Sequence, residues 1–378
     1  MKNTKSFKFF LAFTLMLSAT GAILQPQANA SSSPRISITI NNIDATLSHD
    51  PMKRSGRVYV PLRDLGALLS LHTSWNPNTK SIQVLGVGQE IVLRPNDSKA
   101  MVNGKNIKID APPIVKQGVT YVPLQLFASV LKVPLTWNAK TNTVNANYTS
   151  PYLYTSVQGT PFWFHKKDGT LYMSTGSKPL TVGKTSMDIK EISTFTAAKL
   201  DAKSYLLQIH DNYGEPHIND VVFRAIVHKE KLALSSKVSY WGHHNHESIE
   251  KAGDLIVMID GKTLKLADAK GTVKASYQAK DLFGEEDNFT VEGAFDEYLL
   301  VRPYQKGTLQ LLNTKTKEFV LLYKELLSDQ DKKIIDTMIN DGATGDSDYA
   351  GDRLSFVKKE GKTLYFNRNE NSLTYQLK

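Results

Sequence analysis

Tyr121-Val122-Pro123-Leu124, followed by Thr136-Trp137-Asn138, has a second copy earlier in the chain. Tyr59-Val60-Pro61-Leu62 precedes Ser74-Trp75-Asn76, and both parts of the motif recur at an offset of 62 residues. A repeat at a fixed offset indicates a structural unit that is present more than once. The chain therefore contains a tandem unit.

Apolar residues follow each proline with the spacing of one helical face. They are Leu62, Leu65, Leu68 and Leu69 in the first copy, and Leu124, Phe127, Val130 and Leu131 in the second. A proline is tolerated where a helix begins, and the Asn-rich segment after each helix favours a turn between two strands. Each unit is thus predicted to consist of a strand, a helix and a hairpin. Because such a unit is too small to bury its own apolar face, we expect the two units to share one core. Trp75 and Trp137 are expected to be equivalent core residues, each packed on the helix of its own unit.

The first thirty residues have the pattern of a secretory signal peptide. Three lysines precede an apolar run at residues 9–17, and Ala28-Asn29-Ala30 is a small-x-small cleavage site. The run is shorter than the roughly 20 residues that a membrane span needs, although an uncleaved anchor is the alternative. Residues 31–35 are predicted to be a linker, with no transmembrane segment after the signal peptide. We expect a secreted, extracellular or cell-wall-associated protein.

Composition narrows the class of protein and its partners. The chain has 378 residues without a cysteine, so its stability has to come from cores rather than disulfides, as suits a bacterial exported protein. The formal charge of +9 becomes +6 when the three signal-peptide lysines are removed. Lysines and arginines are scattered singly, which argues against nucleic acid. An anionic cell-wall polymer or a surface protein is the expected partner.

Residues 36–148 resemble the copper amine oxidase N-terminal-like domain, also called the stalk domain. The resemblance rests on MVNGK (101–105), IDAPP (109–113), GVTYVPL (118–124) and LTWNAKTNTV (135–144). Arg63 keeps the Val-Pro-Leu-Arg pattern of the family, and Gln125 departs from it. The resemblance implies an antiparallel sheet packed on helices, in a secreted protein of a spore-forming Gram-positive bacterium.

The resemblance does not imply amine oxidase activity. In that enzyme family the catalytic tyrosine lies in a Thr-x-x-Asn-Tyr-Asp/Glu context, and three histidines bind copper. The sequences Asn147-Tyr148-Thr149 and Asn212-Tyr213-Gly214 both lack the acidic residue. We therefore expect neither this activity nor a cofactor.

Residues 151–378 are predicted to form a separate all-β domain. Short strand-like runs alternate with glycine turns, and a Thr-Leu pair follows the turn at Thr170, Thr263, Thr308 and Thr363. The spacings fit a period near 45 residues, with an inserted helix at residues 328–340. Such a period predicts a β-propeller of about five blades, and a β-sandwich of hairpins is the alternative. The fold class is therefore an α+β tandem stalk module followed by an all-β, propeller-like domain.

Two groups of residues are candidates for chemistry. His243, His244 and His246 are spaced as ligands of zinc or copper, although a solvated histidine-rich loop is the preferred interpretation. Paired carboxylates hydrolyse glycosides in many enzymes. The acidic residues that gather in one region are Glu285, Glu286, Asp287, Glu292, Asp296 and Glu297. No nucleophile elbow or zinc-protease motif is present, so no catalytic residue is assigned.

Three functions remain open from these observations. The first is a non-catalytic secreted or cell-wall-associated protein, in which the stalk module positions a β-rich domain that binds a polymer or protein. The second is a secreted glycoside-type hydrolase on a propeller scaffold. The third is a metal-binding or sensing protein that uses the His243–His246 loop.

Overall fold

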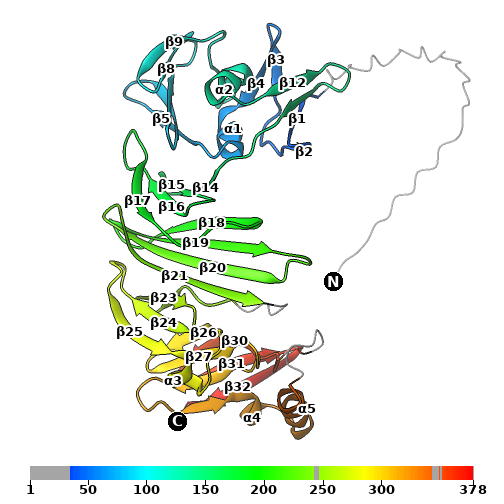
Figure 1. The fold of residues 1–378 in the computed structure, drawn as a ribbon, viewed down its shortest axis with the longest axis vertical. Coiled ribbons are helices and arrows are strands. Elements are labelled where there is room, and N and C mark those ends of the chain that lie inside the picture. Colours follow the sequence, from blue (N-terminus) through cyan, green and yellow to red (C-terminus); the bar gives the residue numbers. More distant parts are fainter. Residues whose placement is uncertain (1–34, 242–246, 343–348, 350, 378) are drawn as a thin grey trace, which may run out of the picture. The chain divides into compact units, whose positions relative to one another are not determined.

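The two copies of the repeat fold in the same way (Figure 1). The structure is a computed structural model that describes residues 35–241, 247–342, 349 and 351–377. The first copy consists of β4 (Arg57–Pro61), α1 (Leu62–Leu68), β5 (His72–Asn76) and β6 (Ser81–Gly86). The second consists of β11 (Val119–Pro123), α2 (Leu124–Leu131), β12 (Leu135–Asn138) and β13 (Thr143–Ala146). The predicted strand, helix and hairpin are confirmed in both copies.

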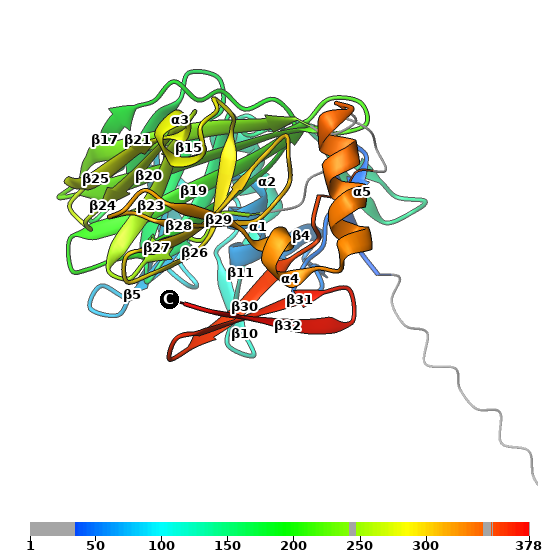
Figure 2. The same ribbon diagram turned by 90° about the horizontal axis from the view of Figure 1, so that it is seen from below.

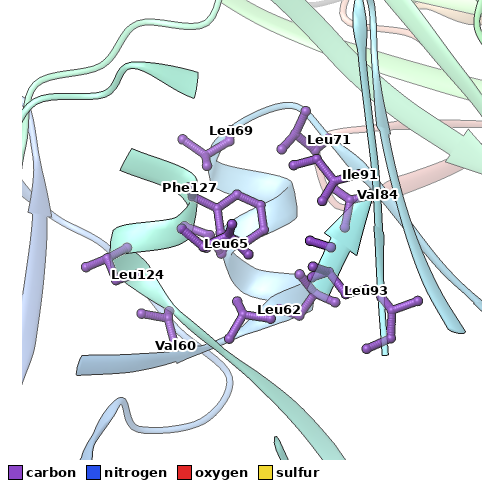
Figure 3. Close-up of a cluster of buried hydrophobic side chains, with 14 of the residues drawn as sticks. Val60, Leu62, Leu65, Leu69, Leu71, Val84, Ile91, Leu93, Leu124 and Phe127 are labelled. Atoms are coloured by element: carbon purple, nitrogen blue, oxygen red, sulfur yellow. The ribbon is translucent and has the colours of Figure 1, made fainter. Parts of the chain in front are cut away.

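One core is shared by the two units, as predicted. Strands β4 and β11 pair antiparallel with Val60 directly opposite Val122, and both side chains are fully buried. Because these valines are 62 residues apart, the pairing relates the units by an approximate twofold axis. Figure 3 shows Phe127 of α2 beside Leu65 of α1 in the centre of this core.

Three sheets surround the shared core. Their strand orders are β10-β11-β4-β3, β5-β6-β7-β8-β9 and β12-β13-β1-β2. The further strands are β1 (Ser37–Ile40), β2 (Ile43–Asp44), β3 (Met52–Arg54), β7 (Gln89–Leu93), β8 (Lys99–Val102), β9 (Lys105–Lys108) and β10 (Ile114–Lys116). The β8–β9 turn has positive φ at both Asn103 and Gly104, as a two-residue hairpin needs. Strand β1 pairs with β13 in parallel, which departs from the purely antiparallel sheet that we expected.

The prediction that Trp75 and Trp137 are core residues is wrong. Their side chains are 53% and 39% exposed. Each indole shares a sheet face with a buried residue, since Trp75 lies opposite Ile82 and Trp137 opposite Val144. However, β5 and β12 are edge strands, and a side chain there has a neighbouring strand on one side only. The two tryptophans therefore lie beside the core rather than inside it.

Five successive sheets follow the module. Their strands are paired antiparallel in chain order, four strands in each of the first four sheets and three in the last. The first sheet contains β14 (Tyr152–Val157), β15 (Thr160–His165), β16 (Thr170–Met173) and β17 (Leu180–Lys184). The second contains β18 (Ile192–Lys199), β19 (Ser204–Tyr213), β20 (Asn219–His228) and β21 (Lys231–Trp241). The third contains β22 (Lys251–Ala252), β23 (Leu255–Asp260), β24 (Thr263–Ala267) and β25 (Val273–Gln278).

The remaining two sheets are accompanied by helices. The fourth contains β26 (Phe289–Phe295), β27 (Tyr298–Pro303), β28 (Gln310–Asn313) and β29 (Phe319–Leu321), and the fifth β30 (Ser355–Glu360), β31 (Thr363–Arg368) and β32 (Asn371–Gln376). The helices are α3 (Ala279–Phe283), α4 (Leu322–Leu326) and α5 (Asp329–Asn340). Helix α5 is the predicted insertion, and the Ser328 hydroxyl caps it by accepting a hydrogen bond from the Asp331 N–H. Helices α4 and α5 lie beside the last sheet (Figure 2) and share its core.

Apolar cores join each of these sheets to the next one along the chain. Phe164 of the first sheet contacts Phe223 of the second, and Val238 of the second belongs to the cluster that contains Val257 of the third. Leu300 of the fourth sheet packs in one cluster with the fifth. The strong β content of this part and its inserted helix agree with the sequence prediction.

Hydrogen bonds connect the module to the first of the five sheets. The Trp163 Nε1–H donates to the Ser70 carbonyl over 2.8 Å, and the Ser70 hydroxyl donates to the Tyr152 carbonyl over 3.2 Å. His72 Nδ1 lies 2.9 Å from the Tyr154 hydroxyl. Throughout the part of the chain that the structure describes, helices are too short or too polar to cross a lipid bilayer.

Candidate binding site

The predicted histidine site falls in a segment that the structure leaves undescribed. His243, His244 and His246 all lie within residues 242–246, outside the described residues. Among the residues that are described, no three His, Cys, Asp or Glu side chains are grouped to hold a metal ion. The metal site therefore stays a prediction from the sequence.

Five of the six carboxylates in the predicted acidic region have a partner in the structure. Glu285 pairs with Lys306 at 2.9 Å, Glu286 with Lys262 at 3.4 Å, and Asp296 with Lys359 at 3.1 Å. Asp287 is buried and accepts a hydrogen bond from the Gln305 N–H, and burial raises its pKa. Glu297 contributes its backbone carbonyl, which accepts from the Thr314 hydroxyl. These contacts are those of ion pairs and turns that hold loops in place.

Glu292, the last member of that acidic group, belongs to a buried ionic network. Its carboxylate accepts two hydrogen bonds from Arg302, at 2.5 Å and 3.0 Å. Arg302 also donates to Asp352 and to the Leu354 carbonyl, both at 2.6 Å. The guanidinium thus ties the fourth sheet to the segment that leads into the fifth, which is a structural role.

A second buried arginine lines a cavity of about 230 Å³ between the second and third sheets. Arg224 donates to Gln208 Oε1 at 2.7 Å and to the Ser248, Ile249 and Val257 carbonyls at 2.8 Å. Burial lowers its pKa. Most N–H groups of the Arg224 guanidinium donate hydrogen bonds that join the two sheets. The arginine at this cavity therefore has a structural role.

Two grooves in the tandem module are related by the repeat. We name them the Trp75 groove and the Trp137 groove, with volumes of about 450 Å³ and 400 Å³. Every one of the twelve residues that line the Trp137 groove has a counterpart 62 residues away that lines the Trp75 groove. Their shared floor positions are Leu62 and Leu124, and Ile82 and Val144. The approximate twofold symmetry of the fold therefore produces a pair of equivalent surface sites.

Each groove is built from both units of the repeat. The Trp75 groove lies between the β5–β6 hairpin of the first unit and residues 115–120 of the β10–β11 hairpin of the second. The Trp137 groove lies between the β12–β13 hairpin and residues 53–58 of the β3–β4 hairpin. Sequence reasoning missed both sites, because neither exists within one unit. The paired Trp at an edge strand was the signal that could have indicated them.

Comparisons with known proteins agree with the resemblance of the module. The copper amine oxidase N-terminal domain family matches residues 39–146, so this part of the chain is similar to that domain. No curated protein is similar to the chain.

Solved structures are similar only at a low level. Apo AztD from Citrobacter koseri is 10% identical with a TM-score of 0.22, covering 66% of this chain and 82% of that chain. A nidogen/laminin complex is 7% identical with a TM-score of 0.22, covering 74% and 85%. KlHsv2 with loop 6CD replaced by a Gly-Ser linker is 7% identical with a TM-score of 0.17, covering 65% and 94%. TM-scores this low do not establish a common fold.

Proposed function

We propose that this is a secreted or cell-wall-associated non-catalytic protein whose tandem module binds a surface polymer. The observation that carries the proposal is the surface groove around the exposed Trp75, which is one of the two grooves that the repeat produces. An exposed indole in a groove offers a flat apolar surface with a polar N–H at its edge, and such side chains are common in recognition sites. Export is supported by the signal-peptide pattern of residues 1–30.

The charge of the module supports an anionic partner. Residues 31–148 contain 13 Lys and Arg against 6 Asp and Glu, a net charge of +7, whereas the whole chain after residue 30 carries +6. The positive charge is therefore concentrated in the part that carries the grooves. A surface of one sign raises the local concentration of a polymer of the opposite sign.

The proposed domain division is a stalk module at residues 36–148 and a propeller-like domain of about five blades at residues 151–378. Five successive antiparallel sheets with strands in chain order, each packed on the next, support the blades. In this arrangement the module also positions the β-rich domain, which presents its own surface to a polymer or a protein. The bonds of Ser70 and His72 to the first sheet support a fixed connection.

Binding of residues 31–378 to isolated Gram-positive cell walls tests the proposal. We expect the protein to sediment with walls, and to sediment less with walls from which anionic polymers have been extracted. Bovine serum albumin is a control for trapping in the pellet. A protein that stays in the supernatant with both wall preparations would contradict a wall-binding function.

A further inference from the structure

We propose that the Trp75 groove binds an acidic glycan and that the Trp137 groove does not. This inference rests on the proposed function and specifies its site and ligand class. The repeat itself supplies the comparison, because equivalent positions in the two grooves carry different side chains.

Charged side chains of the module lie against the indole of the Trp137 groove and along its wall. The Lys53 ammonium lies 5.5 Å from the centre of the Trp137 ring, in the range of a cation–π contact. Arg57 forms a two-point ion pair with Asp110, at 2.5 Å and 2.7 Å. Hydrogen bonding from Arg57 holds the pKa of Asp110 below its usual value, so the pair is charged at neutral pH. A ligand for Trp137 would have to displace Lys53 and compete with this pair.

The Trp75 groove has none of these groups at the equivalent positions. Val115 replaces Lys53, Val119 replaces Arg57, and Ser48 replaces Asp110. The Ser48 hydroxyl is turned to Asp64, to which it donates at 2.8 Å. Consistently, Trp75 is 53% exposed and Trp137 39% exposed. The indole of the first groove is therefore available to a ligand.

The side chains around Trp75 fit a sugar ring. A pyranose has an apolar face of C–H groups that stacks on an indole, and a rim of hydroxyl groups that donate and accept hydrogen bonds. Thr73, Ser74 and Thr120 line the groove and provide hydroxyls with both donor and acceptor capacity. An apolar indole surrounded by hydroxyls matches this combination of faces.

Arg63 indicates that the glycan is acidic. Its side chain is exposed and lines the groove, and a guanidinium binds carboxylate or phosphate oxygens at two points. Among the lining residues of the Trp75 groove there is no Asp or Glu, and the module carries +7. Gln125 occupies the equivalent position in the Trp137 groove, which therefore lacks this cation. The departure of Gln125 from the family pattern thus coincides with the groove in which Lys53 lies over the indole.

The test uses residues 31–378 with hexagalacturonate as the acidic probe and its methyl ester as the neutral one. Binding is measured by calorimetry for the unmodified chain and for Trp75→Ala, Trp137→Ala and Arg63→Gln. We expect hexagalacturonate to bind more tightly than the ester. Trp75→Ala should lower the affinity about tenfold or more, which corresponds to about 1.4 kcal/mol. Trp137→Ala, the matched control, should change it less than about threefold.

Arg63→Gln copies the second groove and should remove the preference for the acidic probe while weak binding of the ester is retained. Because Trp75 and Arg63 are exposed, both variants should unfold in urea at the midpoint of the unmodified chain. Equal losses from the two Trp variants would overturn the difference between grooves. Equal binding of acid and ester would overturn the acidic class. Binding of poly-glutamate peptide that depends on Trp75, without binding of hexagalacturonate, would assign the groove to a peptide between the edge strands β5 and β10 and overturn the glycan.

Wall sedimentation of the same variants separates this inference from the proposed function. If the unmodified chain and Trp75→Ala sediment equally with walls, the wall function stands and the Trp75 site is wrong. If the unmodified chain does not sediment, the wall function itself fails.

Discussion

Arg302 is a charged side chain that the fold holds almost completely out of water. It is 2% exposed, and its ion-pair partner Asp352 is fully buried. We expect Arg302→Ala to lower the free energy of unfolding by about 3–5 kcal/mol, because removal of one partner leaves buried carboxylates uncompensated. Equilibrium unfolding in urea measures it. Lys265→Ala removes a partly exposed pair with Asp260 and should cost less than about 1 kcal/mol, so a similar loss in both variants would contradict the buried network.

Phe127 and Trp137 are aromatic residues ten positions apart with different environments. Phe127 is buried in the shared core, so Phe127→Ala should cost about 3–5 kcal/mol through lost burial and the cavity left behind. Trp137→Ala should cost clearly less, because its indole keeps much of its contact with water. Urea midpoints of the two variants give the comparison. A larger loss for Trp137→Ala would mean that the indole is part of the core after all.

Single residues were the hardest part to predict from the sequence. Periodicity identified Leu62, Leu65 and Phe127 as core residues because it reports which face of a helix is apolar. It could not separate Trp75 from them, because the burial of an indole also depends on whether its strand lies at an edge. Nor did it find Arg224 or Arg302, since each is buried by contacts with residues that are distant along the chain.

At the scale of elements, we expect His72 of β5 to make the contact between the module and β14 dependent on pH. Burial lowers its pKa from the usual 6.5, so the folded protein favours the neutral ring. The stabilisation is present above pH 6.5 and is lost as the pH falls below it, since the unfolded chain binds the proton more readily. We expect the melting temperature to fall between about pH 7.5 and about pH 5.

His72→Gln provides the control for that dependence. A glutamine side chain does not titrate, so the fall in melting temperature over the same pH range should be smaller in this variant. Thermal unfolding of both proteins at each pH gives the measurement. An identical pH profile for the two chains would show that His72 does not contribute.

Helices and hairpins of the module were predictable because their signals are local. A proline followed by apolar residues at helical spacing predicted α1 and α2, and Asn103-Gly104 predicted the β8–β9 turn. The parallel pairing of β1 with β13 was not predictable, because it joins the beginning and the end of the module. The grooves depend on that same long-range assembly, since each takes residues from both units.

For the whole molecule, the charge distribution predicts how the proposed cell-wall protein would be retained. The module carries +7 and the whole chain after residue 30 carries +6, so the later residues contribute no net attraction to an anionic wall. Exposed charges are screened beyond about 8 Å at physiological ionic strength and beyond about 3 Å at about 1 M salt. We therefore predict that washing cells in about 1 M salt releases most of the cell-associated protein.

The Trp75 groove makes the prediction for the high-salt wash more specific. Stacking on Trp75 does not depend on ionic strength, so the fraction that resists the high-salt wash should be smaller for Trp75→Ala than for Trp137→Ala. Immunoblots of washed cells and supernatants give both fractions. If most of the unmodified protein stays on the cells at high salt and Trp75→Ala stays equally, attachment is neither electrostatic nor through the groove. The β-rich domain would then be the part that holds the wall.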